Sequence, residues 1–418
     1  MIEKSVNDFI NLAIQSGGWM ILDKVYLKNR LISLIGDWPT EEIEGDEAVK
    51  KKTSLELLDD LLNQGKENKK YSNDEEREML REEIMELLTP PTSVVNALFS
   101  QHYDTAEKEA TDYYHLLNIN NGFINSRVLS KSELLLKESP FILQQKESVT
   151  SLENSCQQCF SSEGLGLKRN RIKRMIRMNL KGESWAFFYE PNPLLDEHAI
   201  FTPEEHAPIT LNRQAHETML RLLDIYPHYF IAYDPLKNAR QDHGYYFGGK
   251  GNIPLAKAEE SHVFDIPGFV KVQASLLNWP LSVIRLRTSS VKNLLNSIEY
   301  LTLRWQQYSY PSLDIMAKDE KGNNHHEILP VFRKEGEDYI AELILVDQSP
   351  AFDKTKEYQN SLFDAQSMVD QLGIINLQTD LDISSRLMEI IKENFEKQQI
   401  FKRTPEGENA FVRFLDTL

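Results

Sequence analysis

The first quarter of the chain carries apolar residues at helical spacing, with charged residues between them. Leu55, Leu58 and Leu62, for example, fall on one face of a helix. The pattern predicts amphipathic helices that pack on one another, at residues 2–15, 20–35, 53–64 and 74–88. The charged stretches Asp37–Lys52 and Asn63–Asn73 are expected to connect them. Two further helices, predicted at residues 92–103 and 105–117, complete a helical region over residues 1–125.

From about residue 126 the pattern changes to short β-branched and aromatic runs separated by turns. The predicted strands lie at residues 185–189, 199–202, 228–233, 282–286, 313–317, 328–332 and 339–346. Helices are predicted between them at residues 212–224, 288–307 and 381–397. Strands interleaved with a few long helices predict α+β or α/β layering around one or two sheets.

The length and net charge of the chain indicate how many domains it has and which ligands its charge disfavours. A chain of 418 residues suggests two or three domains. Its 64 acidic residues outnumber 47 basic ones, and a net charge of −17 disfavours nonspecific binding to nucleic acid or anionic membranes. Met1–Ile21 has neither the charge pattern of a secretion signal nor the apolar length of a membrane span. We therefore expect a cytoplasmic protein.

The only two cysteines stand together as Cys156-Gln157-Gln158-Cys159. At this spacing two thiolates can bind one zinc ion, which makes the pair half of a metal site. A redox pair and two plain buried cysteines are the alternatives. Ten histidines could supply the missing ligands, but most of them, including His216 and His326, are expected to be surface or hydrogen-bonded groups.

Two further segments could bind an anion. Lys168–Arg177 holds six cations in ten residues, which suits a phosphate-bearing ligand or a solvated face, and less well a nucleic acid. Gln241–Gly251 is dense in glycine and contains a histidine and two tyrosines. Its backbone amides could approach an anion, and its polar side chains could carry chemistry, although a plain glycine-rich hairpin has the same composition.

The order of these segments along the chain is more specific than any one of them. The cysteine pair and the basic run are followed by Gly182–Phe187, Glu197-His198, Glu205–Pro208, Tyr226–Phe230 and Trp279–Leu286. This order resembles the second bacterial branch of the galactose-1-phosphate uridylyltransferases, and the resemblance covers nearly the whole chain.

The resemblance implies an α+β fold with two histidine-triad-like halves, at residues 126–260 and 261–418, after the helical region. It implies transfer of UMP from UDP-glucose to galactose 1-phosphate through a covalent nucleotidyl-enzyme intermediate, in galactose metabolism. The expected partners are UDP-glucose and a hexose 1-phosphate, without nucleic acid or membrane, and a homodimer is compatible with the family. Zinc is the one expected cofactor, with no organic cofactor. The residues implied to bind the nucleotide and its phosphates are Asn170, Arg174, Gly248, Gly249, Arg285 and Arg287.

The family's catalytic motif, His-x-His-x-Gln, is altered here. In an ungapped register fixed by Gly248-Gly249 and Lys257-Ala258, His243 takes the place of the first histidine, a zinc ligand in the metal-bearing members. Tyr245 then replaces the nucleophile and Phe247 the glutamine. A rival register makes His243 the nucleophile but requires a two-residue insertion.

The ungapped register completes a Cys₂His₂ set of Cys156, Cys159, His206 and His243. His206 is preferred to His198 because the run Phe201–His206 is similar to the family run that carries a zinc ligand. Two functions remain open. One is an active transferase with His243, or unusually Tyr245, as nucleophile. The other is a catalytically degenerate paralogue that keeps zinc or nucleotide binding in a regulatory or binding role.

Overall fold

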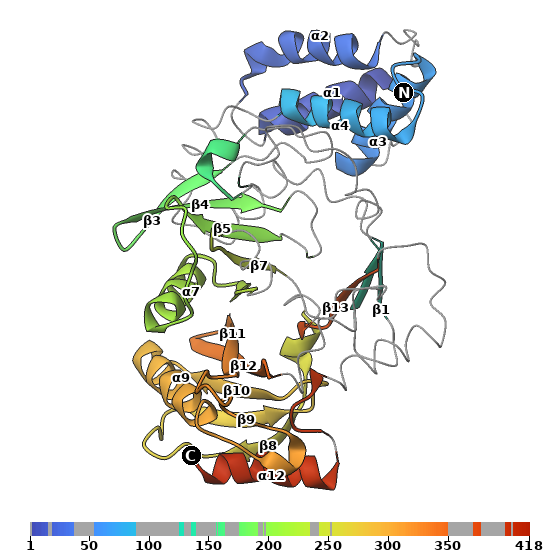
Figure 1. The fold of residues 1–418 in the computed structure, drawn as a ribbon. Coiled ribbons are helices and arrows are strands. Elements are labelled where there is room, and N and C mark those ends of the chain that lie inside the picture. The colour runs from blue at the N-terminus through green and yellow to red at the C-terminus, as the bar shows by residue number, and fades with distance from the viewer. Residues whose placement is uncertain are drawn as a thin grey trace. The chain divides into compact units, whose positions relative to one another are not determined.

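The computed structural model combines an N-terminal helical region with a large antiparallel sheet, which confirms the α+β class (Figure 1). It describes residues 2–15, 19–36, 54–88, 125–128, 135–138, 156, 158–163, 175–190, 195, 198–234, 242–250, 253–349, 371–377, 398–402 and 404–418. The chain divides into two compact units, Met1–Phe123 with Val149–Pro193, and Ile124–Ser148 with Leu194–Leu418. Within the described residues, no helix has the length and apolar character needed to cross a membrane.

Four helices form the described N-terminal region, and the predictions for them are confirmed. They are α1 (Ile2–Gln15), α2 (Lys24–Ile35), preceded by the single turn η1 (Ile21–Asp23), α3 (Ser54–Glu67) and α4 (Asp74–Leu88). Their core includes Phe9, Leu31, Leu58 and Ile84. α3 continues to Glu67, into the predicted connection, because its helical spacing also buries Gln64 beside Leu61. The predicted helices at residues 92–103 and 105–117 lie outside the described residues.

The same unit contains the antiparallel hairpin of β3 (Ile176–Leu180) and β4 (Glu183–Tyr189). Lys181 and Gly182 join the strands, both with positive φ (54° and 91°), as a tight two-residue turn requires. The predicted strand at residues 185–189 is confirmed within β4. β3 begins inside the basic run, where Ile176 pairs with Phe187.

In the second unit, eight antiparallel strands pair in the order β5-β7-β6-β11-β12-β10-β9-β8. Their bounds are β5 (Ala199–Pro203), β6 (Tyr229–Ala232), β7 (Tyr246–Lys250), β8 (Glu260–Phe264), β9 (Gln273–Leu277), β10 (Val283–Thr288), β11 (His326–Glu335) and β12 (Asp338–Asp347). Five of these confirm predicted strands. The strand predicted at residues 313–317 is wrong: Pro311 starts a short turn, η6 (Pro311–Leu313), and Asp314 has a left-handed φ of 59°.

This sheet contains a repeated strand–helix–strand–strand unit. β5 is followed by α7 (Arg213–Ile225), β6 and β7, and β10 is followed by α9 (Val291–Trp305), β11 and β12. In each copy the third strand lies between the first and the second, and the two copies meet where β6 pairs with β11. The predicted helices at residues 212–224 and 288–307 are confirmed as α7 and α9.

Both helices cover the same face of the sheet (Figure 1). The Tyr246 hydroxyl donates to the Ala215 carbonyl of α7, and the Trp305 ring of α9 stacks on His326 at 3.9 Å. Arg213 Nη1 of α7 donates to Glu299 Oε2 of α9 at 2.5 Å, which links the two helices. We call the face that α7 and α9 cover the helix face, and the opposite face the motif face. Register pairs place one row of residues on it, from Ile200 through Phe247, Ala232, Val331 and Glu342 to Arg285.

Smaller elements complete the described fold. β1 (Asn125–Val128) pairs antiparallel with β2 (Leu135–Glu138), which pairs parallel with β13 (Ile374–Leu377). The C-terminal helix α12 (Pro405–Asp416), which the sequence pattern did not predict, packs Phe414 against Trp305. The helix predicted at residues 381–397 lies outside the described residues.

His216 of α7 was expected to be a surface or satisfied group, and this is wrong. Its side chain is buried on the helix face, edge-on to Phe332, and neither ring nitrogen has a hydrogen-bond partner among the described residues. Burial without a partner penalises the charged ring and lowers the pKa of His216 from 6.5 to about 4. His326 is also buried, but its nitrogens reach the Trp305 carbonyl and Asp347, so the expectation of a satisfied group holds there.

The lowered pKa of His216 predicts a loss of stability in acid. The unfolded chain takes up the proton first as the pH falls below 6.5, so the contribution of neutral His216 is complete above that pH and is lost towards about pH 4. The loss amounts to roughly 3 kcal/mol across this window. Urea unfolding of wild type and His216→Leu at several pH values should show a shallower pH dependence in the variant. His262→Leu, at an exposed position of β8, is the control, and equal slopes in all three proteins would exclude His216 as the cause.

Candidate metal centre

The two cysteines lie on one tight turn. The Cys159 amide donates to the Cys156 carbonyl at 3.2 Å, and Cys159 directly precedes the single turn η4 (Phe160–Ser162). Both thiols are half-buried and neither forms a disulfide. The turn brings the two sulfur atoms to one side of the chain, as a shared metal ion requires.

His243 comes shortly before β7 and is fully buried. Its Nε2 lies 3.0 Å from the Pro203 carbonyl oxygen and 3.1 Å from the Thr202 hydroxyl at the end of β5. A carbonyl oxygen can only accept, so the contact with Pro203 is satisfied when Nε2 carries the proton. The lone pair of a neutral ring then lies on Nδ1, the arrangement in which a histidine binds a metal while its other nitrogen is held by a carbonyl.

The next residue, Gly244, locks His243 against the loop that follows β5. Its amide donates to the Ala207 carbonyl at 2.9 Å. A Cβ at this position would lie 2.4 Å from the Ile209 backbone nitrogen, so only glycine allows the two segments to approach this closely. The glycine therefore fixes the position of the His243 backbone.

His206 lies on that loop and is exposed. Its ring centroid is 4.8 Å from that of His243. His198 is buried elsewhere, edge-on to Phe247 with ring centroids 5.9 Å apart. Of the two histidines weighed as ligands, His206 is the one beside His243.

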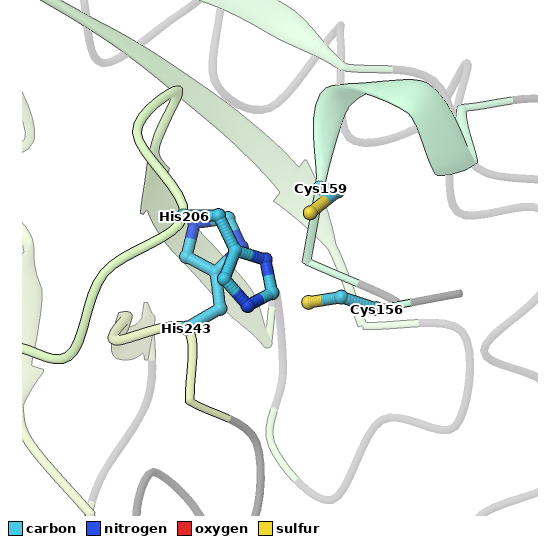
Figure 2. Close-up of side chains that lie close together, drawn as sticks. All are labelled: Cys156, Cys159, His206 and His243. Atoms are coloured by element: carbon cyan, nitrogen blue, oxygen red, sulfur yellow. The ribbon is translucent and has the colours of Figure 1, made fainter. Parts of the chain in front are cut away.

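One potential ligand atom from each of Cys156, Cys159, His206 and His243 lies within 4.8 Å of the other three. Figure 2 shows the two imidazole rings side by side, with both sulfur atoms turned towards them. Two sulfur and two nitrogen ligands suit tetrahedral zinc, whose ligand atoms stand about 3.3–3.8 Å apart at the usual bond lengths. The residues fit the ion after a contraction of about 1 Å, within the reach of side-chain rotation.

Comparison with known proteins identifies the family. Residues 18–141 match the family model described as galactose-1-phosphate uridyl transferase, N-terminal domain. A galactose-1-phosphate uridylyltransferase of Lactococcus lactis subsp. cremoris is 30% identical over 390 residues, which cover 87% of this chain and 77% of the relative. The chain belongs to the galactose-1-phosphate uridylyltransferase family.

Further relatives carry the same name. The Lactococcus lactis subsp. lactis protein is 31% identical over 83% of this chain and 75% of its own length. The Enterococcus faecalis protein is 25% identical over 93% of this chain and 84% of its own length. No solved structure matches the chain. The predicted family and its class, the nucleotidyltransferases, are thus confirmed.

The altered family motif runs into β7. Tyr245, immediately before the strand, and Phe247 within it are both buried, and alternation along β7 directs the Phe247 side chain to the motif face. Gly248 points to the helix face, where a Cβ would lie 2.2 Å from the Phe230 carbonyl oxygen. The close packing against β6 alone explains why residue 248 is glycine, without any role in phosphate binding. Phosphate binding by Gly248 and its neighbour Gly249 stays a prediction.

Of the four cationic or polar side chains predicted to bind the nucleotide, Asn170 and Arg174 lie outside the described residues. The buried Arg285 guanidinium donates to the carbonyls of Leu255, Ala256 and Ala258, at 3.1–3.2 Å, and to Glu342 at 3.0 Å. These bonds fix the short helix η5 (Pro254–Lys257) to the motif face.

Arg287, two residues along β10, is more exposed and donates to Glu335 at 2.6 Å. Both arginines thus already have acceptors within the protein, and nucleotide binding by either stays a prediction. Glu342 itself is fully buried, and its Oε1 also accepts from Arg333 Nε at 3.0 Å. Arg333 Nη2 lies 2.9 Å from the same oxygen, which is ion-pair distance without hydrogen-bond alignment.

Sequence reasoning missed the groups that support these residues. Thr202 and Pro203 belong to the Phe201–His206 run that identified His206, but nothing in the run indicates contact with His243. Glu342 is a single carboxylate within an otherwise apolar predicted strand, a pattern that could have signalled a buried ion pair.

Proposed function

We propose that this chain transfers UMP from UDP-glucose to a hexose 1-phosphate, galactose 1-phosphate in the family, on a scaffold held by zinc. The observation that carries the proposal is the grouping of Cys156, Cys159, His206 and His243 in a chain of this family. The reaction belongs to galactose metabolism, and we propose the cytoplasm as its location, where two free cysteines stay reduced.

The proposed zinc ligands are the two thiolates, one nitrogen of His206 and Nδ1 of His243. Thiolate and imidazole ligands favour zinc over magnesium or calcium, which prefer oxygen. Four protein ligands leave no open position on a tetrahedral ion, so the bound zinc would cross-link the turn before η4 to the segments around β5 and β7. Its role in this proposal is structural.

The ligand role of His243 supports the ungapped register of the motif. A nucleophilic histidine must turn a lone pair towards the α-phosphorus of the substrate. His243 is fully buried, its Nε2 faces Pro203, and its remaining nitrogen is needed for the metal. We therefore propose that His243 is a zinc ligand and not the nucleophile.

Tyr245, the residue before β7, is then the candidate nucleophile. In the proposed step the Tyr245 hydroxyl loses its proton to a base, and its oxygen bonds to the α-phosphorus of UDP-glucose. The bond from that phosphorus to the glucose 1-phosphate oxygen breaks, and glucose 1-phosphate leaves. A hexose 1-phosphate oxygen then attacks the uridylyl-tyrosine, forms the new UDP-sugar and restores the tyrosine.

The second candidate function is a catalytically degenerate paralogue that keeps zinc and nucleotide binding. The burial of Tyr245 and the apolar Phe247 at the glutamine position favour it. A buried phenol has no access to substrate unless the site opens, and phenylalanine cannot donate a hydrogen bond to a phosphoryl oxygen.

We also infer that residues 126–260 and 261–418 contain two related histidine-triad-like halves. The repeat of β5-α7-β6-β7 as β10-α9-β11-β12, with the same order of pairing, supports this inference. An antiparallel pair of strands also precedes each copy along the chain. β3 and β4 precede β5, and β8 and β9 precede β10.

Incubation with UDP-glucose labelled at the α-phosphate separates the two functions. The active transferase is expected to retain label after denaturation. A tyrosyl phosphodiester withstands mild acid, whereas a phosphohistidine does not. Tyr245→Phe should abolish the label and Tyr246→Phe, which changes the neighbouring side chain on the helix face, should leave it in place.

Three results would count against parts of this proposal. Acid-labile label that is lost in His243→Ala would restore His243 as nucleophile and overturn the ungapped register. Label retained in Tyr245→Phe would exclude Tyr245. An unlabelled protein that still binds UDP-glucose in equilibrium dialysis would support the degenerate paralogue over the transferase.

A further inference from the structure

The turn that carries Cys156 and Cys159 is joined to the strand β3 by one carboxylate. Glu163 directly follows η4, and its Oε1 accepts from the Met175 amide at 2.6 Å. Its Oε2 accepts from Arg177 Nη2 at 2.9 Å. Both carboxylate oxygens therefore connect the cysteine segment to the beginning of β3.

Arg177 also contacts the other end of η4. The central carbon of its guanidinium lies 3.9 Å from the centroid of the Phe160 ring, which is a cation–π distance. Phe160 is the first residue after Cys159, and Glu163 is the fourth. The short helix that follows the second cysteine is thus held at both of its ends by the same arginine.

The burial of this link distinguishes it from an ordinary surface ion pair. Exposed pairs contribute little, because water screens the charges and two long side chains must be ordered. The Glu163 side chain is only 13% exposed, and one of its two hydrogen bonds comes from the backbone. Arg177 is 38% exposed, and Phe160 covers one face of its guanidinium. The link therefore holds the turn in a defined position on β3.

The same link gives a role to one cation of the basic run Lys168–Arg177. Of the six cations in this run, Arg177 is the only one among the described residues. Its Nη2 is bound by a carboxylate of the chain itself, next to the cysteine turn. This cation therefore supports the turn, and phosphate binding by the rest of the run stays a prediction.

We propose that Glu163 and Arg177 are positioning residues of the metal centre, which hold the thiols of Cys156 and Cys159 in place before an ion binds. Neither belongs to the group of four ligands. They act through the turn, because a turn that is already fixed loses less conformational freedom when its two sulfur atoms bind one ion. The inference rests on the proposed zinc site, and it concerns the affinity of that site for the ion.

Competition with a chromogenic chelator under reducing conditions measures this effect. Glu163→Gln keeps an oxygen for the Met175 amide but loses the charge that pairs with Arg177, and it should raise the zinc dissociation constant roughly tenfold. Arg177→Met removes the ion pair and the cation–π contact and should raise the constant by a similar factor. Glu183→Gln, at an exposed position of the same hairpin, is the matched control and should leave zinc affinity unchanged.

Two further measurements separate positioning from a general disruption of the fold. The double variant Glu163→Gln/Arg177→Met should lose no more affinity than either single variant, because both substitutions break the same link. At saturating cobalt(II), Glu163→Gln should show the same thiolate-to-cobalt absorption as wild type. Positioning residues change the affinity for the ion but leave all four ligands available to it.

These experiments distinguish failure of the inference from failure of the zinc site. A wild-type chain that binds no zinc overturns the metal centre, and this inference with it. If wild type binds zinc and Glu163→Gln binds it equally tightly, the positioning role is wrong and the metal centre stands. Additive losses in the double variant, or an equal loss in Glu183→Gln, likewise overturn the positioning role alone.

Discussion

Replacing Arg285 with methionine is expected to lower the free energy of unfolding by about 3–5 kcal/mol. The buried guanidinium holds three carbonyl oxygens of the segment Leu255–Ala258 and one carboxylate oxygen of Glu342. Methionine fills part of the volume but donates no hydrogen bond. The carbonyls then lose these donors, and of the cations that the structure describes around Glu342 only Arg333 remains to neutralise it.

Urea unfolding measures this loss, and Arg287→Met is the matched control on the same strand. Arg287 and its partner Glu335 are partly exposed, so the control should cost no more than about 1 kcal/mol. Arg285→Lys should not rescue the fold, because one ammonium group cannot reproduce the fork that serves four acceptors. Equal losses at the two positions, or full rescue by lysine, would contradict the structural role of Arg285.

The variant His243→Ala is expected to weaken zinc binding by at least about a hundredfold. Structural zinc sites bind with about 10–16 kcal/mol at neutral pH, so one ligand of four accounts for about 3 kcal/mol or more. Thr202→Val should weaken binding by about tenfold, because it removes only a group that orients His243.

Competition with a chromogenic chelator measures these affinities, and His198→Ala is the matched control. His198 is a buried histidine outside the four-residue group, so its loss should leave zinc affinity unchanged. If His198→Ala weakens binding as much as His243→Ala, the ligand set is wrong. If the effect of Thr202→Val equals that of His243→Ala, the distinction between ligand and orienting residue fails.

Strong local patterns explain which elements could be predicted. The helical spacing of α1 and α4 and the β-branched run of β12 are local, and their predictions were confirmed. β7 could not be predicted, because the pair Gly248-Gly249 is typical of a turn. In the structure, glycine is needed at position 248 because the strand β6 approaches it closely. At Leu313–Ala317 the apolar content suggested a strand, but Pro311 and the left-handed Asp314 determine a turn.

The grouping of Cys156, Cys159, His206 and His243 could be predicted, because the cysteine spacing and the family resemblance both indicate it. Cys-x-x-Cys requires only one turn of chain, and the motif register supplied His243. The partners of these residues could not be predicted. The contacts of His243 with Thr202 and Pro203, and of Arg285 with Leu255–Ala258, depend on strand pairing between distant segments. His216 shows the same limit, since its burial follows from the packing of α7 on β11.

The zinc content of the purified chain, measured by mass spectrometry after gel filtration, tests the central claim most directly. We expect about one zinc ion per chain in wild type and in His198→Ala, and almost none in Cys156→Ser or His243→Ala. A wild-type chain without zinc that does not bind added zinc would contradict the claim. So would full zinc content in Cys156→Ser, because the ion would then be held somewhere other than at Cys156, Cys159, His206 and His243.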